Sequence, residues 1–475
     1  MLSLERPLPP SVPAGSATAI FCTGVCFDSD RSISALELVV DGVRHPASAW
    51  GMPRPDVSGS PAGGFWATVP VPAHDGPGEI VVEVAAGFAD GAAATAEVGR
   101  IAVLEPSQLP RPAASARPAR EGGGLIAVCM ATFEPDRALL TAQLESLRAQ
   151  TDERWVCVIS DDGSSAARFE QILELVGGDD RFEVSRAPER RGFYRNFERA
   201  LRMAPADAEL IALCDQDDRW DPDKLQTLRA ALGDATLVYS DLRLVDRDGQ
   251  VLRDTLWRGR ANNHDDLASM LVANTITGAA VLFHRRLLEV ALPFPDTPGF
   301  QFHDSWLSVA ALASGRVAYV DRPLYDYVQH PGAVFGDVTH GPRRRRAVRP
   351  GNPLTRWRAA YFHGYLGRAA QAQVLLMRLA ERIDAPKRRT LERFVACDDS
   401  PSALAWLAAR SARCLLGRTE TLGSEFGLAQ GVAWKQVAAA TARRSTRGPG
   451  KLLDASIPPP DRFSQKRLRR WRARV

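Results

Sequence analysis

Between residues 125 and 214 the chain alternates short apolar segments with amphipathic ones, and this alternation restricts the fold more than any other sequence feature. Leu125–Ala131 is a continuous apolar run, which is typical of a strand buried on both faces. Apolar residues then recur at helical spacing. The same pattern predicts strands at residues 125–131, 155–160, 182–185 and 210–214, with helices between them. Repeated strand–helix units predict a mostly parallel sheet covered by helices.

The next helix is expected to begin at Asp221. An acidic N-cap followed by proline at the first helical position is the favoured arrangement, and Asp221-Pro222 provides it. A later helix is expected over Trp306–Ala313, with Asp304 at its start. The α/β domain is therefore predicted to span residues 125–342.

The first 105 residues read as an all-β domain. Gly, Pro and Asp separate short apolar runs, and no helical period is present. Strands are expected at residues 17–26, 36–40, 65–71, 79–85 and 92–104. Five to seven strands at this spacing predict a small β-sandwich of immunoglobulin-like type, which we interpret as an accessory docking or spacer domain. Residues 106–124 contain four prolines and end in three glycines, which is typical of a semi-rigid linker.

The C-terminal region, residues 343–475, is predicted to be helical and basic. It carries 29 Lys and Arg against 9 Asp and Glu, although the net charge of the whole chain is only +4. One helix is expected to open at Ser400-Pro401 and close at Gly417. Another, over the last fourteen residues, places Leu468 and Trp471 on one face of a basic helix. This pattern favours an anionic membrane surface as partner, with a merely solvated face as the alternative. No nucleic acid is expected, because no aromatic platform or known motif accompanies the charge.

Composition excludes several classes of protein. No stretch reaches the ~18 uninterrupted apolar residues of a membrane span, and Met1–Pro10 has no apolar run behind it, so neither an integral membrane protein nor a signal peptide is expected. Seven irregularly spaced cysteines argue against a disulfide framework or a zinc site. We expect a cytoplasmic protein. Its basic C-terminal end would let it associate peripherally with the inner face of the cell membrane.

Acidic residues follow the predicted strands at the points where these strands end. The second strand is followed by Asp161 and Asp162, and the fourth by Asp215, Asp217 and Asp218. Ligands bind beyond the carboxyl ends of the strands in open parallel sheets. Crowded carboxylates repel one another, and a bound cation relieves the repulsion. Carboxylate ligands select Mg²⁺ or Mn²⁺, so we expect one of these ions as cofactor. No Walker loop or GxGxxG follows any strand, which argues against NTPases and dehydrogenases.

From about Leu125 to Gly336 the sequence resembles the family-2 glycosyltransferases, which have a GT-A fold, and in particular their bacterial rhamnosyltransferase-like branch. Five motifs carry the resemblance in the family's order: the Asp-x-Asp signature at 214–220, the donor-side loop at 190–198, the acceptor-side strand at 277–283, the base-carrying segment at 303–307 and the closing segment at 324–330.

The resemblance implies a role for each matching residue. Asp304 would be the catalytic general base. Asp217 would be a direct metal ligand, with Asp215 and His330 as further ligands. The acceptor side would include Gly278, His303 and Trp306. The nucleotide-sugar would be held by Thr132, Phe133, Glu134, Asp161, Asp162, Arg191 and Asp215.

Structural roles compete with some of these assignments. Asp162 could instead cap a helix or turn through Gly163, and Asp218 is expected to brace its loop rather than bind metal. His303 could pack rather than contact acceptor. Asp221 is expected to act only as an N-cap, and Trp220 as core packing.

Together these features predict an inverting, metal-dependent glycosyltransferase. It would move a sugar from a UDP- or dTDP-linked donor to a surface-glycan or lipid-linked acceptor, with Asp304 removing the proton of the acceptor hydroxyl. The first alternative is a non-catalytic scaffold that binds glycan or nucleotide-sugar. The second is a sugar nucleotidyltransferase, which usually needs a Gly-rich basic loop where Thr132-Phe133-Glu134-Pro135 stands.

Overall fold

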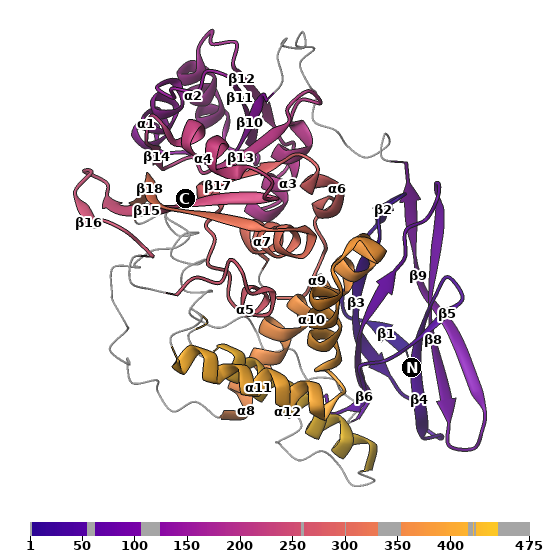
Figure 1. The fold of residues 1–475 in the computed structure, drawn as a ribbon. Helices are drawn as coiled ribbons and strands as arrows, with labels where there is room; N and C mark the ends of the chain where they lie inside the picture. The colour runs from indigo at the N-terminus through magenta and orange to yellow at the C-terminus, as the bar shows by residue number, and fades with distance from the viewer. Residues whose placement is uncertain are drawn as a thin grey trace.

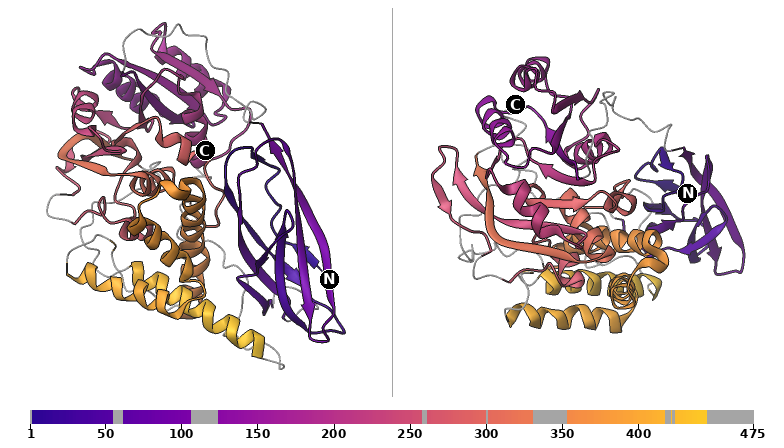
Figure 2. Two further views of the ribbon diagram at one scale, coloured as in Figure 1. Left: turned by 45° about the vertical axis from the view of Figure 1, so that its right-hand side comes forward. Right: turned by 45° about the horizontal axis from the view of Figure 1, so that its top comes forward.

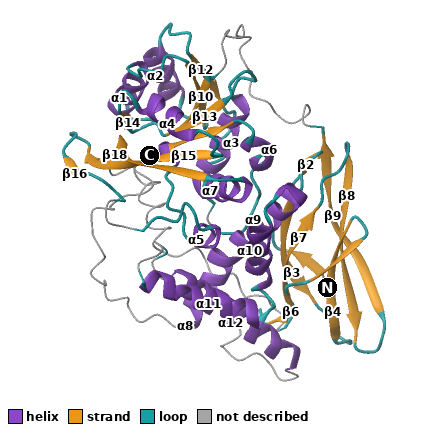
Figure 3. Ribbon diagram, in the orientation of Figure 1, coloured by secondary structure: helices purple, strands orange, loops and turns teal. Residues whose placement is uncertain are grey.

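The computed structural model of the 475-residue chain describes residues 2–54, 62–105, 124–257, 261–299, 301–330, 353–416, 421 and 424–444. These residues form an N-terminal β region, a central α/β region and a C-terminal group of helices (Figure 1). Figure 3 separates the three by secondary structure, with strands alone in the first and helices alone in the last.

The N-terminal region is a two-sheet β-sandwich. One sheet has the order β1-β3-β7-β6 and the other β2-β9-β8-β4-β5, and apolar residues from both sheets share one core. Its strands are β1 (Leu2–Leu4), β2 (Ser11–Pro13), β3 (Thr18–Cys26), β4 (Ile33–Val40), β5 (Val43–Pro46), β6 (Ala49–Met52), β7 (Gly64–Val71), β8 (Gly78–Phe88) and β9 (Ala93–Leu104).

All five strands expected in this region are present, as β3, β4, β7, β8 and β9. The short strands β1, β2, β5 and β6 were not predicted, because three or four residues carry too little periodicity. Asp41 and Gly42 both have positive φ, 52° and 79°, and form the tight turn between β4 and β5 that a two-residue hairpin requires. The immunoglobulin-like type of the sandwich stays a prediction.

The central region is built on one mixed sheet. In the described part of the chain its order is β12-β11-β10-β13-β17-β15-β18-β14, with β16 beside β15. Strands β12, β11, β10 and β13 are parallel, and β17 runs against both of its neighbours. The strands are β10 (Ile126–Thr132), β11 (Trp155–Asp161), β12 (Phe182–Arg186), β13 (Leu210–Cys214), β14 (Arg219–Trp220), β15 (Leu237–Asp246), β16 (Val251–Arg253), β17 (Val281–His284) and β18 (Val317–Gln329).

Helices cover this sheet. Every residue of β11 is buried, so both faces of the sheet are covered there, as its apolar run predicts. Leu140, Leu144 and Leu147 are buried on the inner side of the first helix, as their spacing predicts. The helices are α1 (Arg137–Arg148), α2 (Ala166–Val176), α3 (Phe193–Met203), α4 (Lys224–Leu232), α5 (Leu267–Val272), the 3₁₀ turn η1 (Gly278–Ala280), α6 (Leu287–Ala291) and α7 (His303–Ser314).

The start of α4 corrects one prediction. The helix begins at Lys224 rather than after Asp221, and the Asp221 carboxylate forms an ion pair with Arg243 on β15. A charged partner from a distant strand attracts this carboxylate more strongly than the helix end does. The predicted N-cap role of Asp221 is therefore wrong.

The C-terminal helices contact both other regions (Figure 2). Trp66 of β7 donates a hydrogen bond from Nε1 to Tyr361 Oη at 3.1 Å. The centroid of its ring lies 5.0 Å from that of Phe362. The elements are α8 (Pro353–Ala359), the π-helical η2 (Ala360–Tyr365), α9 (Leu366–Leu379), η3 (Ala380–Arg382), α10 (Ala385–Ala396), α11 (Pro401–Leu415) and α12 (Ser424–Arg444). The predicted helix opening at Ser400-Pro401 is α11.

Parts of the prediction fall outside the described residues. These parts are most of the linker, the arginine run 343–346, Gly417 and the basic helix of the last fourteen residues. The domain boundaries at 106–124 and 342–343 therefore stay predictions. No helix in the described ranges combines the length and the hydropathy needed to cross a membrane.

Arg378 of α9 connects the three regions. Its guanidinium donates to the carbonyl oxygens of Ala17 in the sandwich and of Val290 and Pro293 in the α/β region, at 2.7–2.8 Å. Burial lowers the pKa of Arg378 to about 10, so it still carries its charge at neutral pH. One guanidinium group thus supplies the hydrogen bonds that water would otherwise make to three carbonyl groups where the three regions meet.

We expect Arg378→Met to destabilise the protein by roughly 2–4 kcal/mol, because three carbonyl groups lose their donor. Thermal denaturation measures the effect, and Arg382→Gln, on the exposed next turn, is the matched control. If both variants melt at the wild-type temperature, Arg378 does not hold the regions together.

Candidate active site

The ends of β10 and β11 are joined by buried hydrogen bonds. Thr132 and Asp161 are register partners at the ends of these strands, and Thr132 Oγ1 donates to Asp161 Oδ1 at 3.2 Å. The same carboxylate accepts from the N–H of Ser164 at 2.9 Å and from its hydroxyl at 2.5 Å. Asp161 is completely buried. In this conformation its carboxylate therefore positions the loop after β11 instead of facing a ligand.

The loop after β10 is fixed to both neighbouring loops. Glu134 has a positive φ of 45°, and its carboxylate accepts from the N–H of Ser165, where α2 starts, at 2.5 Å. Phe133 donates from its N–H to Gln216 Oε1 at 2.8 Å, and its ring lies 3.9 Å below the guanidinium of Arg190. Phe133 and Glu134 thus lie where the resemblance implies, but the carboxylate of Glu134 is engaged at a helix terminus.

Asp162 holds the loop before α3. Its two carboxylate oxygens accept from the N–H groups of Arg191 and Gly192, both at 2.8 Å. Burial raises the pKa of this carboxyl, and the two N–H groups act against that rise. The contacts of Asp162 therefore agree with the alternative that it caps a helix. The helix concerned is α3, however, and not the helix that follows Gly163. The side chain of Arg191 points outward and is half exposed.

Two polar residues of α3 that we did not single out from the sequence hold the sheet edge together. Asn196 donates to the carbonyl oxygens of Thr132 and Ser160 and accepts from the Ser160 hydroxyl at 2.6 Å. Arg199 donates to that same hydroxyl at 2.7 Å and to Ser185. Their spacing of three residues on an otherwise apolar helix face is the signal that sequence reasoning could have used.

The carboxylates after β13 and before α7 converge. Burial, together with the negative charges of Asp217 and Asp304, raises the pKa of Asp215 to about 7. Asp304, which is 87 residues further along the chain than Asp217, therefore lies within electrostatic range of the Asp-x-Asp loop. Tyr327 of β18 lies near all of these acids, because their charges raise the pKa of its hydroxyl. Asp215, Asp217 and Asp304 therefore lie near one another, and their roles as metal ligands and base stay predictions.

Asp218 is the deepest acid of this loop. It is 2% exposed; Oδ1 accepts from the N–H of Val328 at 3.4 Å, and Oδ2 has no hydrogen-bond partner among the described residues. Burial raises its pKa well above the ordinary value, with the charges of Asp215 and Asp217 adding to the rise. The expected bracing role for Asp218 agrees with these contacts.

Asp217 and His330 form a pair. His330 Nε2 lies 2.7 Å from Asp217 Oδ2, where β18 ends beside the loop after β13. Within the described residues, no three His, Cys, Asp or Glu side chains are placed to hold a metal ion together. Two protein ligands still fit Mg²⁺ or Mn²⁺, because such ions usually take one or two carboxylates and complete their shell with water and substrate phosphates. Asp215 is near the pair without completing a three-residue site.

Asp304 lies in the first turn of α7, which begins at His303, three residues earlier than predicted. Its Oδ1 accepts from the N–H of Ser305 at 2.6 Å. Burial raises the pKa of Asp304 from 3.8 to about 6, and the N–H groups of Ser305 and Gly278 act against this rise. The carboxyl is therefore ionised at neutral pH and more basic than an exposed aspartate.

The acceptor-side residues divide into two groups. His303 Nε2 lies against Gly278, where a side chain would collide with it, and its ring stacks on Phe197 at 3.6 Å. Burial lowers the pKa of His303 to about 3, so its imidazole is neutral. Trp306 is fully buried and donates from Nε1 to Ala291 O at 2.8 Å. The predicted acceptor contact of Trp306 is thus wrong, because this side chain lies in the core and anchors α7.

Lys224 is a buried cation that sequence reasoning missed. Its ammonium lies 3.5 Å from the centre of the Trp220 ring and donates to the carbonyl of Ala279 in η1. Burial lowers the pKa of Lys224 to about 7, while the charges of Asp218 and Asp215 act against this. Lys224 therefore joins the metal loop to the Gly278 segment. Its position at a helix start resembles that of a solvated lysine, so the sequence offers no signal.

The sequence profile described as "Glycosyl transferase family 2" matches residues 127–291. These residues form a glycosyl transferase family 2 domain. The match and the sheet order together confirm the predicted fold class, an α/β domain of GT-A type. The rhamnosyltransferase-like branch stays a prediction.

Three known proteins are similar to parts of this chain, each at low sequence identity or over a short stretch. The "Uncharacterized protein y4gI" of Sinorhizobium fredii (strain NBRC 101917 / NGR234) is 30% identical over 130 residues, which are 26% of this chain and only 14% of that protein. S. aureus TarS 1–349 in complex with UDP-GlcNAc is 14% identical, with a TM-score of 0.39, over 67% of this chain and 92% of that one. The mannosyltransferase PcManGT of Pyrobaculum calidifontis in complex with GDP-Man and Mn²⁺ is 17% identical, with a TM-score of 0.35, over 71% and 91%. These ligands belong to those two proteins.

The raised pKa of Asp304 has a consequence for stability. The folded state binds the proton of Asp304 more tightly than the unfolded state, so between about pH 4 and 6 a rise in pH lowers the free energy of unfolding. Above pH 6 the full cost of the buried charge is present. We therefore expect Asp304→Asn to stabilise the metal-free protein at pH 7.5 by on the order of 1–3 kcal/mol.

Thermal unfolding of this variant and the wild type at pH 4.5 and pH 7.5 tests this expectation. The gain should shrink at the lower pH, and Asp75→Asn, an exposed acid of the sandwich, should show no gain at either. A destabilised Asp304→Asn at pH 7.5 would mean that the carboxylate is not strained by burial.

Proposed function

We propose that this protein is an inverting, divalent-metal-dependent glycosyltransferase. It would transfer a sugar from a nucleoside-diphosphate donor, UDP- or dTDP-linked, to a surface-glycan or lipid-linked acceptor. The observation that carries the proposal is the convergence of three groups that such a reaction needs. They are a carboxylate–imidazole pair, Asp217 and His330; a second acid between the sites, Asp215; and a separate, more basic carboxylate, Asp304.

In this proposal Asp304 acts as the general base. It takes the proton from the acceptor hydroxyl as the oxygen attacks the anomeric carbon, and the bond from that carbon to the donor diphosphate breaks on the opposite side. One attack inverts the configuration at the sugar. The N–H groups of Ser305 and Gly278 orient the carboxylate, and the rise in pKa to about 6 makes it a stronger base that is still ionised at pH 7.

Asp217 and His330 would hold the Mg²⁺ or Mn²⁺ ion. The chemistry that such an ion supplies there is neutralisation of the charge on the departing diphosphate. Lys224 and Asp218 keep the loop that carries Asp217 in place from below. The half-exposed Arg191 would contact the donor from a loop whose backbone Asp162 holds.

The location of the protein is also part of the proposal. We infer a cytoplasmic enzyme whose basic C-terminal region associates with an anionic lipid surface, as the excess of 29 Lys and Arg over 9 Asp and Glu after residue 342 favours. The arginine run 343–346 and the last fourteen residues of this region lie outside the described residues. A lipid-linked acceptor is consistent with such a location.

The first experiment tests the need for a metal ion, the role of Asp304 as base and the alternative of a non-catalytic scaffold. We expect hydrolysis or transfer of a UDP- or dTDP-sugar with Mn²⁺ present and none with EDTA. Asp304→Asn should lower turnover by roughly 10²–10⁴-fold while keeping Mn²⁺-dependent thermal stabilisation by UDP or dTDP. Asp217→Asn should lose both the turnover and the Mn²⁺-dependent stabilisation by nucleotide.

Asp75→Asn is the matched control for both variants and should behave as wild type. A wild-type protein that binds nucleotide but turns over no nucleotide-sugar would favour the scaffold alternative. Wild-type-like turnover of Asp304→Asn would remove this residue from the role of base.

The pH dependence gives an independent test of the base. Because the proton on Asp304 blocks its action, kcat/KM of the wild type should fall as the pH decreases through about 6, the value to which burial raises its pKa. The residual activity of Asp304→Asn should lack this step. Initial rates between pH 5 and 8 at saturating Mn²⁺ measure it, and an identical profile for both proteins contradicts the assignment.

A further inference from the structure

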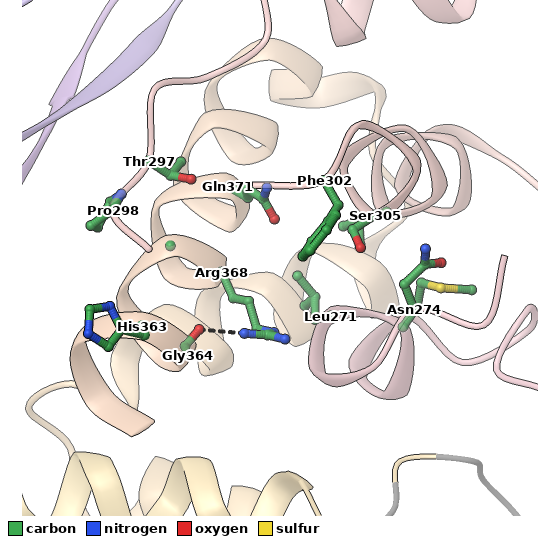
Figure 4. Close-up of a pocket in the computed structure, with 13 residues that line it drawn as sticks. Leu271, Asn274, Thr297, Pro298, Phe302, Ser305, His363, Gly364, Arg368 and Gln371 are labelled. Carbon is green, nitrogen blue, oxygen red and sulfur yellow. Dashed lines mark hydrogen bonds between the residues drawn. The ribbon is translucent and has the colours of Figure 1, made fainter. Parts of the chain in front are cut away.

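A cavity of about 220 Å³ lies next to the proposed base, where the family 2 domain meets the C-terminal helices. Residues of α5 and α7 and Phe302 form one wall, and residues of η2 and α9, with Thr297 and Pro298 beside them, form the other (Figure 4). Ser305, whose N–H donates to the Asp304 carboxylate at 2.6 Å, is one of the lining residues. The cavity therefore adjoins the turn of α7 that carries Asp304, although Asp304 itself is not one of its lining residues.

Arg368 is the charged residue in the cavity wall. Its side chain extends from α9 toward the side of the cavity where Leu271, Phe302 and Ser305 lie (Figure 4). One guanidinium nitrogen donates to the carbonyl of Gly364 in its own helix at 2.7 Å. A guanidinium has five N–H donors, so this bond leaves most of its capacity for a ligand.

No carboxylate neutralises this cation within the described residues. The described lining residues of the cavity include no Asp or Glu, and Arg368 forms no ion pair with any described residue. Burial alone lowers the pKa of Arg368, and no neighbouring acid acts against that. Arg410, by contrast, is paired with Asp266 at 2.8 Å. A partly buried arginine without a counter-ion is costly unless a ligand supplies the negative charge.

Close backbone packing keeps Arg368 at this wall. A Cβ atom at Gly367 would collide with the carbonyl oxygen of Pro298, and one at Gly299, where φ is +89°, would lie 2.9 Å from the carbonyl oxygen of His363. Glycine at both positions lets α9 approach the segment before α7. Gln371, one turn after Arg368, adds an amide to the same wall (Figure 4).

We propose that this cavity binds the acceptor through a negatively charged oxyanion group, a phosphate or a carboxylate, and that Arg368 forms the ion pair with it. The proposal rests on the proposed function and adds the chemical class of the acceptor. The cavity is smaller than the about 300–1,000 Å³ typical of small-molecule sites, so it takes one anionic end of an acceptor rather than a whole chain. A bidentate guanidinium pair selects planar or tetrahedral oxyanions over neutral sugar hydroxyls.

Binding to three ligands tests the proposal in the full-length protein, with EDTA present to keep metal-bound diphosphate chemistry apart. We expect glucose 6-phosphate or glucuronate to bind at least about 10-fold more tightly than glucose in isothermal titration. The two anions distinguish phosphate from carboxylate as the preferred group. Equal affinity for all three ligands, or no saturable binding of either anion, overturns the proposal.

Variants locate the binding to this cavity. Arg368→Gln should weaken binding of the preferred anion by at least about 10-fold, and Arg368→Lys, which keeps the charge without the fork, by less. Gln371→Met adds bulk at the same wall without changing charge and should also weaken binding, which keeps the test valid if Arg368→Gln unfolds. Arg389→Gln, an exposed arginine of α10, is the matched control. Anion binding by Arg368→Gln at wild-type strength overturns the assignment.

A second readout separates this inference from the proposed function. Mn²⁺-dependent stabilisation by UDP or dTDP reports on the donor side alone and should be the same in the Arg368 variants and the wild type. If the nucleotide stabilises the protein and the anions do not bind, the acceptor inference fails alone. If the anions bind through Arg368 and no nucleotide does, the cavity stands and the proposed function fails.

Discussion

Burial of carboxylates between the end of β13 and the start of α7 is the physical constraint around which the α/β region is organised. Burial raises the pKa values of Asp215, Asp218 and Asp304, and the charges of neighbouring acids add to the rise at Asp215 and Asp218. Such a cluster is stable only if protons, hydrogen bonds or cations compensate for the lost hydration. The ammonium of Lys224 below the loop supplies part of this compensation. A divalent ion on the Asp217–His330 pair would supply the rest when donor binds.

The acids and polar groups around this cluster are used mainly to hold loops. Asp161 fastens the ends of β10 and β11 to Ser164, Asp162 fixes the backbone of the Arg191 loop, and Glu134 binds the start of α2. These hydrogen bonds lie within the protein and hold the loops in one arrangement. A pre-formed site loses less conformational entropy on binding than one that must order its loops. In the proposed function, the side chains that would face donor, metal or acceptor are Asp215, Asp217, His330, Arg191 and Asp304.

The C-terminal helices are part of this arrangement and not an appendage to it. Arg378 ties α9 to the sandwich and to the α/β region, and the Trp66–Tyr361 hydrogen bond adds a second attachment. The same helix, α9, carries Arg368 to the cavity beside Ser305. The sandwich contacts α9, the helix that forms one wall of the proposed acceptor cavity, and can therefore influence this cavity through that helix.

The sequence by itself determined the strands and helices of residues 125–214 and the set of acids at the ends of these strands. Apolar runs and helical spacing are local, so β10 to β13 and the buried Leu140, Leu144 and Leu147 could be predicted from neighbouring residues alone. The order of five motifs identified the family and brought Asp217 and Asp304 into one hypothesis. Tertiary structure alone decided what each charge pairs with. Asp221 pairs with Arg243 instead of capping α4, Trp306 anchors α7 in the core, and Lys224 is buried. It also decided that Arg368 faces a cavity and has no counter-ion among the described residues. Electrostatic partners are separated by tens to hundreds of residues along the chain, and desolvation depends on the whole fold, so no local pattern encodes either.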